Sequence, residues 1–363
     1  MDTTKLANFY HGKTVLITGH TGFKGSWLSL VLIGMGAKVV GISLPPKTSK
    51  DIFVVTGLES QVSHHEFDIR DFEQLSTLFS AEKPDVVFHL AAQPLVRQSY
   101  LEPLETFTTN VTGTANVMEA LRLSHSIGSA VIITTDKVYE NREWIYGYRE
   151  NDSLGGHDPY SGSKAAADIV ADSYRKSFFS PEKYNETHNT LVATARAGNV
   201  IGGGDWSQNR LVPDIMRAVF EGDGIVTLRN PESTRPWEHV LESVSGYLIL
   251  GMRLGEGDKG VSGNWNFGPS SEAFISVGEV TSKTLNFLDK GTMKIERDDT
   301  KHEANELVLD VTKANRLLGW YSKWSIDETL LKTAEWYRIT NDDPSSALAV
   351  TNRQIEEYFY FQK

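Results

Sequence analysis

The sequence predicts an α/β fold, in which a doubly wound parallel sheet is joined to a smaller mixed α+β domain. Three observations support this fold class. Short apolar runs alternate with helical stretches through the first half of the chain, a glycine-rich turn follows the first run, and the rhythm changes after about Gly198. Strands that alternate with helices form right-handed βαβ units, so they give a parallel sheet covered on both faces.

The strands of the predicted sheet are short runs rich in β-branched and apolar residues. They cover residues 13–18, 37–43, 62–67, 85–90, 130–135 and 191–196. The helices between them cover residues 26–35, 72–80, 105–123 and 165–178. This succession is typical of a Rossmann-type sheet, whose ligands bind at the carboxyl ends of the strands near a topological switch point.

Two domains are expected. Residues 1–197 form the sheet domain, and residues 198–363 form mainly a substrate-binding cap, with an approximate boundary and some segments returning to the first domain. In the cap, helices are expected near residues 212–220 and after Val277 and Ile326. The cap would close over the sheet, where a ligand site is expected.

The composition excludes several classes of function. Hydrophobic residues make up 40% and charged residues 23% of the 363 residues, as in ordinary globular proteins. The formal charge of −11 gives no global attraction for nucleic acid or an anionic membrane. The chain has no cysteine, which excludes disulfides and thiolate catalysis. Its ten histidines show no metal-ligand spacing, so no metal is expected.

No segment is expected to enter or cross a membrane. Residues 1–13 lack the apolar core of a signal peptide. The most membrane-like stretch, residues 27–44, contains Lys38 and is broken by Gly34 and Gly36. A helix, a turn and a strand are therefore expected there, and the protein is expected to be cytoplasmic.

The glycine-rich turn GHTGFKG lies between the first strand and the first helix. Glycines allow a tight turn and a close approach of the backbone to a pyrophosphate, and the helix N-terminus adds N–H groups and a positive dipole end. The alternative is an ordinary βα turn, but a strand before and a helix after favour a dinucleotide site. The turn residues expected at the dinucleotide are Gly19, Thr21, Gly22, Phe23, Lys24 and Gly25.

One expected part of a dinucleotide site is missing. An acid about twenty residues after the turn would bind the adenosine ribose, yet the second strand ends on Ser43. No arginine replaces the acid, and Lys47 alone is a poor signal for a 2′-phosphate. The sequence therefore favours NAD over NADP only modestly.

The fifth strand ends unusually, because its apolar run leads into Thr135, Asp136 and Lys137. Burying charge is costly unless the charge is paired or used, so this strand end is either a solvated turn or a reaction centre. Tyr160 and Lys164 lie four residues apart and share one helix face. A nearby ammonium lowers the pKa of a phenol, so Tyr160 could act as a base; the alternative is a surface pair.

These motifs together resemble the extended short-chain dehydrogenase/reductase family over nearly the whole chain. The resemblance rests on the glycine turn, Asp68-Ile69, His89-Leu90-Ala91-Ala92, Asn110, the Tyr160–Lys164 pair and Asn266-Phe267-Gly268. It implies NAD as cofactor, with Asp68 and Ile69 by the adenine and Leu90, Ala91, Ala92 and Thr109 lining the cofactor. Ser43 is expected at the cofactor as well.

Within that family, Thr135-Asp136-Lys137 is similar to the triplet of the sugar-nucleotide 4,6-dehydratases. The resemblance implies that Tyr160 removes the C4 hydroxyl proton while Thr135 hydrogen-bonds that hydroxyl and Lys164 holds the nicotinamide ribose. Asp136 would protonate the departing C6 hydroxyl and Lys137 would remove the C5 proton. Asp136 must then be protonated and Lys137 neutral, which burial favours.

The resemblance also implies a nucleotide-sugar substrate, CDP-D-glucose, converted to a 4-keto-6-deoxy sugar for deoxysugar biosynthesis of the O-antigen type. Arg210 and Arg235 are candidates for the diphosphate, because a guanidinium makes paired hydrogen bonds to phosphate. Asn199 is expected at the nucleotide and Gln93 at the sugar. For any one arginine, the alternative is a solvated surface charge.

Other functions stay open at this point. A nucleotide-sugar 4-epimerase or reductase of the same family needs the Tyr160–Lys164 pair but not Asp136 and Lys137. A non-catalytic NAD-sensing protein needs neither pair. The resemblance further implies a homodimer or homotetramer, in which helices 105–123 and 165–178 pair the subunits.

Overall fold

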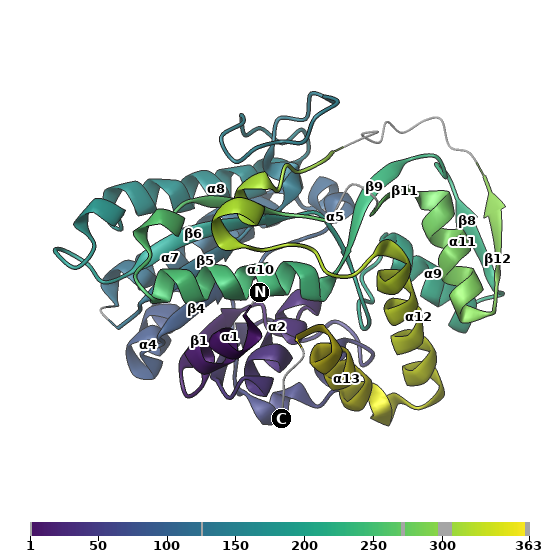
Figure 1. The fold of residues 1–363 in the computed structure, drawn as a ribbon, viewed down its shortest axis with the longest axis horizontal. Coiled ribbons are helices and arrows are strands. Elements are labelled where there is room, and N and C mark those ends of the chain that lie inside the picture. Colours follow the sequence, from purple (N-terminus) through teal and green to yellow (C-terminus); the bar gives the residue numbers. More distant parts are fainter. Residues whose placement is uncertain (1, 125, 270–272, 297–306, 360–363) are drawn as a thin grey trace.

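The computed structural model describes residues 2–124, 126–269, 273–296 and 307–359, and it confirms the predicted α/β fold (Figure 1). A seven-stranded sheet has the strand order β10-β6-β5-β4-β1-β2-β3, and every neighbouring pair is parallel. Its strands are β1 (Thr14–Thr18), β2 (Lys38–Ser43), β3 (Ser63–Glu66), β4 (Val86–His89), β5 (Ser129–Ile133), β6 (Leu191–Ala197) and β10 (Asn264–Phe267). The order reverses between β1 and β4, so the switch point lies at their carboxyl ends.

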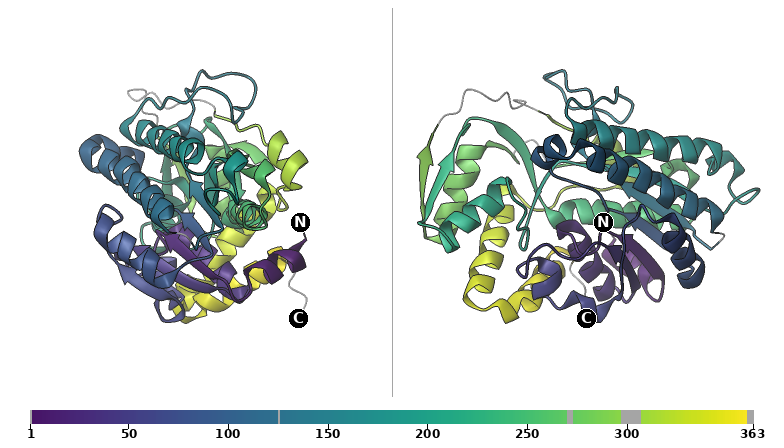
Figure 2. Two further views of the ribbon diagram at one scale, coloured as in Figure 1. Left: turned by 90° about the vertical axis from the view of Figure 1, so that its left-hand side faces the viewer. Right: turned by 180° about the vertical axis from the view of Figure 1, so that it is seen from behind.

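Helices cover both faces of this sheet (Figure 2). Successive strand residues point to opposite faces, so Val15 and Ile17 join one hydrophobic core while Leu16 joins the other. On the first face lie α1 (Thr3–Tyr10), α2 (Phe23–Gly34) and α10 (Val240–Gly255). On the second face lie α4 (Phe72–Glu82), α7 (Gly113–Leu123) and α8 (Pro159–Ser177). Burial on both faces explains why these strands read as continuous apolar runs.

A smaller mixed part lies at one end of the sheet (Figure 1). It contains the three-stranded sheet β11-β9-β7 and the two-stranded sheet β12-β8. Its strands are β7 (Asn199–Ile201), β8 (Ile225–Leu228), β9 (Thr234–His239), β11 (Phe274–Ser276) and β12 (Thr292–Ile295). Its helices are α9 (Leu211–Phe220), α11 (Val277–Leu288) and α12 (Ile326–Asp342). These helices match those expected near residues 212–220, 277 and 326.

Two segments from the second half of the chain lie with the large sheet. Strand β10 pairs with β6, and α10 packs against β5 and β6. The C-terminal helix α13 (Ala347–Phe359) packs against α2. The sequence did not predict α1, α10 or α13, because their apolar residues do not stand out from the surrounding chain. The two-domain division at residue 197 stays a prediction.

Several element boundaries differ from the expected ones. Helix α8 begins at Pro159 rather than near residue 165, because the Asp158 side chain accepts a hydrogen bond from the Ser161 N–H and proline suits the first turn. The helix expected over residues 105–123 is α6 (Pro103–Phe107), a π-helical turn η2 (Thr108–Thr112) and α7. The remaining short helices are α3 (Ile52–Val55) and α5 (Val96–Leu101).

A buried ion pair fixes α8 to the sheet. Arg196 on β6 donates to both oxygens of Asp168 on α8, at 2.8 and 2.9 Å, and both side chains are fully buried. The Thr134 hydroxyl, just beyond β5, donates to the same carboxylate at 2.9 Å. Helix α8 therefore sits in a defined position relative to the ends of β5 and β6. Within the described ranges, no helix is both long and apolar enough to cross a bilayer.

Candidate active site

The glycine-rich turn connects β1 to α2 at the switch point. Gly19 has a φ of +80°, and a Cβ there would lie 2.8 Å from the backbone nitrogen of Ala91. A Cβ on Gly25 would lie 2.1 Å from the Gly19 carbonyl oxygen. Gly22 is the N-cap of α2 and provides no side-chain hydrogen bond to the first turn. The turn is therefore compact, and the N–H groups of the first helical turn are directed to an incoming anion.

The end of β4 lies directly beside this turn. Leu90 donates its N–H to the Thr18 carbonyl at 3.0 Å, and Ala91 donates to the Thr18 hydroxyl at 3.2 Å. The buried His89 bridges Thr18 and Thr114, with nitrogen–oxygen distances of 2.7 and 2.9 Å. Burial lowers the pKa of His89 to about 3, so this bridge is neutral. Ala92 follows in the same partly buried segment.

Ser43 at the end of β2 faces the turn. Its hydroxyl lies 2.7 Å from that of Thr21, which also donates to the Leu44 carbonyl at 2.9 Å. Strand β3 places Glu66 in register with Ser43. The acid that the sequence lacks at the end of β2 is thus available from the neighbouring strand, which one-dimensional spacing could not reveal.

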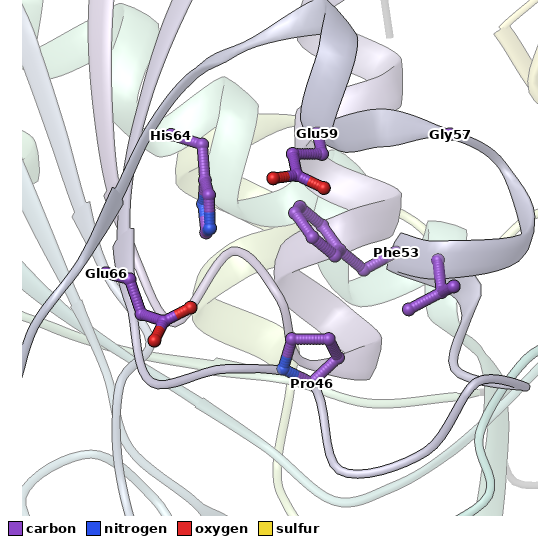
Figure 3. A pocket seen from close by; sticks show the side chains of 7 residues that line it. Pro46, Phe53, Gly57, Glu59, His64 and Glu66 are labelled. Atoms are coloured by element: carbon purple, nitrogen blue, oxygen red, sulfur yellow. The ribbon is translucent and has the colours of Figure 1, made fainter.

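A cavity of about 160 Å³ lies beside this end of the sheet (Figure 3). The lining residues include Pro46, Phe53, Glu59, His64 and Glu66, and the figure shows the carboxylates of Glu59 and Glu66 on opposite sides of the Phe53 ring. The cavity contains none of the predicted catalytic residues and is smaller than a typical ligand pocket. It does not define the reaction centre.

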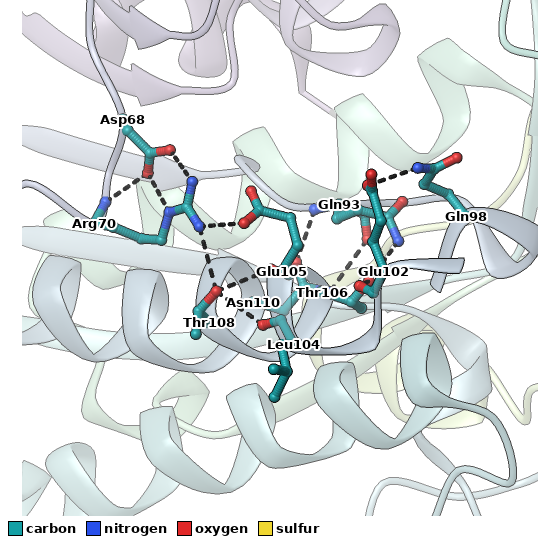
Figure 4. A network of polar contacts seen from close by, with 10 residues as sticks. All are labelled: Asp68, Arg70, Gln93, Gln98, Glu102, Leu104, Glu105, Thr106, Thr108 and Asn110. Carbon is teal, nitrogen blue, oxygen red and sulfur yellow. Dashed lines mark hydrogen bonds and ion pairs between the residues drawn. The ribbon is translucent and has the colours of Figure 1, made fainter. Parts of the chain in front are cut away.

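Asp68 and Ile69 follow β3, and both are engaged by neighbouring side chains. Asp68 forms a paired salt bridge with Arg70, at 2.6 and 3.0 Å, and Arg70 reaches Glu105 on α6 at 2.6 Å (Figure 4). These contacts lower the pKa of Asp68, chiefly through the hydrogen bonds from Arg70. Ile69 is buried against Gly113, where a Cβ would lie 2.4 Å from its terminal methyl.

Gln93 and Asn110 form a second network in the same view (Figure 4). Asn110 accepts from the Gln93 N–H at 2.8 Å and donates to the Gln93 carbonyl at 3.1 Å and to Ser163 on α8 at 2.8 Å. The Gln93 side chain donates to Thr106 and to the Leu95 carbonyl. Gln93, expected at the sugar, is thus occupied by its own loop, and Thr109 lies beside Asn110 in η2. Asn110 positions α8 through Ser163.

The triplet after β5 separates into two environments. Thr135 and Asp136 are 7% and 3% exposed, whereas Lys137 is exposed. Asp136 and Lys137 belong to the short 3-10 helix η3 (Asp136–Val138), which Thr135 caps, and the Thr135 hydroxyl donates to Asp136 Oδ1 at 2.8 Å. Burial raises the pKa of Asp136, while the Lys137 and Lys24 charges and the Thr135 hydrogen bond oppose this rise.

Tyr160 and Lys164 are buried in the first turns of α8. Lys164 Nζ donates to the Ile133 carbonyl at 2.9 Å, and burial lowers its pKa to about 8. Burial raises the pKa of Tyr160 to about 12, while a Thr135 hydrogen bond and the Arg210 charge lower it. In this structure, the cation that acts on the phenol is therefore Arg210 rather than Lys164.

A buried group that the sequence did not single out lies next to Asp136. Both carboxylate oxygens of Glu238 on β9 are buried, and neither has a hydrogen-bond partner among the described residues. Burial raises the pKa of Glu238 to about 8, against the attraction of Lys24. Lys24 extends from the glycine turn to Tyr247, with an Nζ–hydroxyl distance of 3.4 Å, and burial lowers its pKa to about 8. Only the tertiary fold brings these residues together.

The remaining predicted residues lie in the smaller part. Arg210, the N-cap of α9, forms an ion pair with the buried Asp205 at 3.1 Å and acts on both Tyr160 and Lys24. Asn199 on β7 pairs in register with Trp237 on β9. Arg235 lies earlier on β9 and donates to the Thr234 carbonyl at 2.8 Å. The structure thus gathers Arg210 with the catalytic candidates, and it places Arg235 on the strand that carries Glu238.

A metal centre is not part of this arrangement: nowhere in the described ranges do three or more His, Asp or Glu side chains come together to hold an ion. A doubly wound sheet, a glycine turn at the switch point, and buried Tyr160 and Lys164 on one helix define an extended short-chain dehydrogenase/reductase. Residues 16–333 match the family described as GDP-mannose 4,6 dehydratase, and the chain belongs to that family.

The relatives include sugar-nucleotide dehydratases and epimerases. The chain is 46% identical over 354 residues to a CDP-glucose 4,6-dehydratase from Salmonella typhimurium, covering 97% of each. A dTDP-glucose 4,6-dehydratase from Streptomyces venezuelae, solved with NAD bound, has a TM-score of 0.76 and 22% identity, covering 91% of this chain and 98% of that one. A UDP-glucose 4-epimerase from Thermotoga maritima has a TM-score of 0.75 and 22% identity, over 90% and 99%.

Proposed function

We propose that the protein is a nucleotide-sugar 4,6-dehydratase that converts CDP-D-glucose to CDP-4-keto-6-deoxy-D-glucose and water, with NAD as a recycled cofactor. The observation that carries this proposal is the buried Asp136 beside Thr135 and Tyr160, because a simple epimerase or reductase has no use for an acid there. The preference for a cytidine nucleotide is supported by the 46% identity to a CDP-glucose 4,6-dehydratase.

The residues of the glycine turn fit a dinucleotide. The close approach of Gly25 to Gly19 leaves no room for a Cβ, and the first turn of α2 has no side-chain cap. Gly19, Thr21, Gly22, Phe23 and Gly25 would hold the pyrophosphate side of NAD. Ser43, Asp68, Ile69, Leu90, Ala91, Ala92 and Thr109 would line the rest of it, with Lys24 extending past the turn toward Tyr247.

Tyr160 would act as the base in oxidation of the sugar at C4. When bound, NAD accepts the C4 hydrogen as hydride and later returns it at C6. The pKa of Tyr160 is raised to about 12 by burial, so a cation must stabilise the phenolate at neutral pH. Arg210 already acts in this direction, and Lys164, which would hold the nicotinamide ribose, lies one helical turn away.

Asp136 and Lys137 would perform the elimination. The C4 ketone acidifies the C5 hydrogen, so Lys137 can remove it while Asp136 protonates the departing C6 hydroxyl. Burial of Asp136 raises its pKa in the direction that a general acid requires. Lys137 is exposed, so its use as a base depends on a substrate that displaces water from it.

The substrate diphosphate would bind where the smaller part meets the sheet. Arg210 and Arg235 are the proposed cations, and the long side chain of Arg210 reaches the field of Tyr160. Asn199 would contact the nucleotide and Gln93 the sugar. For Gln93, this contact requires its side chain to exchange the Thr106 bond for a sugar hydroxyl.

The test is product analysis with CDP-, dTDP-, UDP- and GDP-glucose. We expect loss of one water and formation of a 4-keto sugar with CDP-glucose, without added reductant and without net reduced cofactor. Faster turnover of another nucleotide would reassign the base but not the reaction. Interconversion of glucose and galactose configurations without loss of water would instead establish an epimerase.

We further propose a cytoplasmic homodimer or homotetramer. Its support is a set of exposed apolar side chains on the helices expected to pair: Leu104 and Phe107 on α6, Leu123 on α7, and Ile169 on α8 are 80%, 41%, 47% and 57% exposed. Apolar side chains that gather on adjacent helices mark association surfaces.

A further inference from the structure

Three buried side chains form a continuous row between α8 and the end of β5. Thr135 Oγ1 lies 2.8 Å from Asp136 Oδ1, and the Thr135 side chain also hydrogen-bonds to Tyr160. The exposed fractions of Tyr160, Thr135 and Asp136 are 9%, 7% and 3%. A hydroxyl can donate one hydrogen bond while it accepts another, so the row can carry a proton in either direction.

The proposed reaction leaves these groups out of balance after each turnover. Tyr160 gains the proton of the C4 hydroxyl, which stays off the product because C4 remains a ketone. Asp136 loses a proton to the departing hydroxyl, which leaves as water. Lys137 takes the C5 proton and returns it to C5 when hydride arrives at C6. The enzyme therefore ends with one proton too many on Tyr160 and one too few on Asp136.

We propose that Thr135 relays the proton of Tyr160 to Asp136 once in every turnover and so restores the resting enzyme. This inference rests on the proposed function and deepens it. The Tyr160 O–H bond breaks as a new O–H bond forms on Thr135, whose own proton passes to Asp136 Oδ1. One negative charge moves from Asp136 to Tyr160, and nothing is oxidised or reduced.

The surroundings favour an internal route over exchange with water. The charged or titratable groups that act on Asp136 are Lys137, Lys24 and Glu238, and among these Lys137 alone is exposed. Those that act on Tyr160 include Arg210, Asp158 and Tyr247. The Thr135 hydrogen bond favours the anion at both ends, lowering the pKa of Asp136 and of Tyr160. A single proton shared between the two ends is therefore the stable arrangement.

The experiment compares the first turnover with later turnovers by rapid quench, using CDP-glucose and the NAD-loaded enzyme. In Thr135→Val, which removes the hydroxyl, we expect a burst of about one product per active site and then a slow phase. The ratio of the first-turnover rate to the steady-state rate should rise about tenfold or more above the wild-type ratio. Thr135→Ser, which keeps the hydroxyl, should retain the wild-type ratio.

Thr134→Val is the matched control, because Thr134 is a buried neighbour whose hydroxyl donates to Asp168 instead. It should leave the ratio unchanged, and thermal unfolding checks that all three variants are folded. Equal slowing of the first and later turnovers in Thr135→Val would overturn the relay and leave Thr135 as a contact of the C4 hydroxyl. A wild type that makes no 4-keto-6-deoxy product would overturn the proposed function, and the relay with it.

Discussion

Asp136 and Lys137 are adjacent in the chain but lie in opposite environments. Asp136 is 3% exposed and its pKa is raised by burial, whereas Lys137 is exposed on the other side of η3. The 3-10 turn produces this separation, since successive side chains leave it in different directions. An acid held neutral inside the protein and a base next to the incoming sugar suit an elimination.

Altering this pair should separate elimination from oxidation. Asp136→Asn cannot protonate the C6 oxygen and Lys137→Met cannot accept the C5 proton, yet both keep Tyr160 and Lys164. We expect the dehydration step to slow by roughly 10² to 10⁴-fold. In single-turnover absorbance, reduced cofactor should form and decay slowly. Dehydration at the wild-type rate in both variants would mean that the pair is only a charged turn.

Removing the Tyr160 hydroxyl should block the reaction at its first step. Tyr160→Phe keeps the buried ring but has no group to accept the C4 proton, so turnover should fall by roughly 10² to 10⁴-fold. The glycine turn is untouched, so NAD affinity measured by calorimetry should stay close to the wild-type value. Near-normal turnover would remove Tyr160 from the mechanism.

Glu238 should make folding stability depend on pH. Its pKa rises from 4.5 in the unfolded chain to about 8 in the folded protein, chiefly because of burial. Between these values the folded state holds a proton that the unfolded state releases, so this group lowers the free energy of unfolding as pH rises from 4.5 to 8. Glu238→Gln removes the titration, and its stability relative to wild type should increase across that range.

Chemical denaturation of both proteins at several pH values measures this difference. Lys24 titrates in the folded state at about 8, against 10.5 when unfolded, so its own effect on stability falls above the Glu238 range. A constant difference between Glu238→Gln and wild type from pH 4.5 to 8 would show that Glu238 is ionised throughout.

At the scale of elements, the βα turn after β1 depends on backbone approach rather than on side chains. A Cβ at Gly25 would lie 2.1 Å from a backbone oxygen of Gly19, whereas one at Gly22 would lie 3.3 Å from the same atom. Backbone in a buried turn cannot move aside as a flexible side chain can, so the two glycines differ in what they tolerate.

Gly25→Ala should therefore damage both stability and cofactor binding. We expect a loss of about 1–3 kcal/mol in the free energy of unfolding, as for an overpacked core, together with loss of measurable NAD binding. Gly22→Ala is the control and should lose less of both. Unfolding in denaturant and calorimetric titration with NAD give the two quantities, and equal behaviour of the two variants would contradict this account of the turn.

At the scale of the whole molecule, the sheet's second face ends in helices whose outer surfaces are partly apolar. Ile169 on α8 is 57% exposed although the opposite side of that helix is packed against the sheet. Scattered exposed apolar residues need no explanation, but these occur on neighbouring helices α6, α7 and α8.

If these helices pair subunits, a charge placed among them should dissociate the oligomer. Ile169→Glu buries an unpaired carboxylate on association, so we expect a smaller mass in size-exclusion chromatography with light scattering. Ile145→Glu is the control, because Ile145 is 94% exposed in a loop outside these helices. An unchanged mass for Ile169→Glu would place the association surface elsewhere.

The sequence by itself determined the sheet, the glycine turn and the two catalytic pairs. Period and composition are local properties, so apolar runs such as that of β5 and the i, i+4 spacing of Tyr160 and Lys164 could be read directly. The helices α10 and α13 escaped, because burial on several sides removes the amphipathic period that marks a surface helix.

Only the tertiary structure decided which of these residues meet and in what environment. It buried Asp136 but exposed Lys137, directed Lys24 from the turn to Tyr247, and set Glu238 beside them from a strand two hundred positions further along. The physical reason is that burial and electrostatic fields depend on packing between distant segments, and protonation follows those fields rather than the order of residues in the chain.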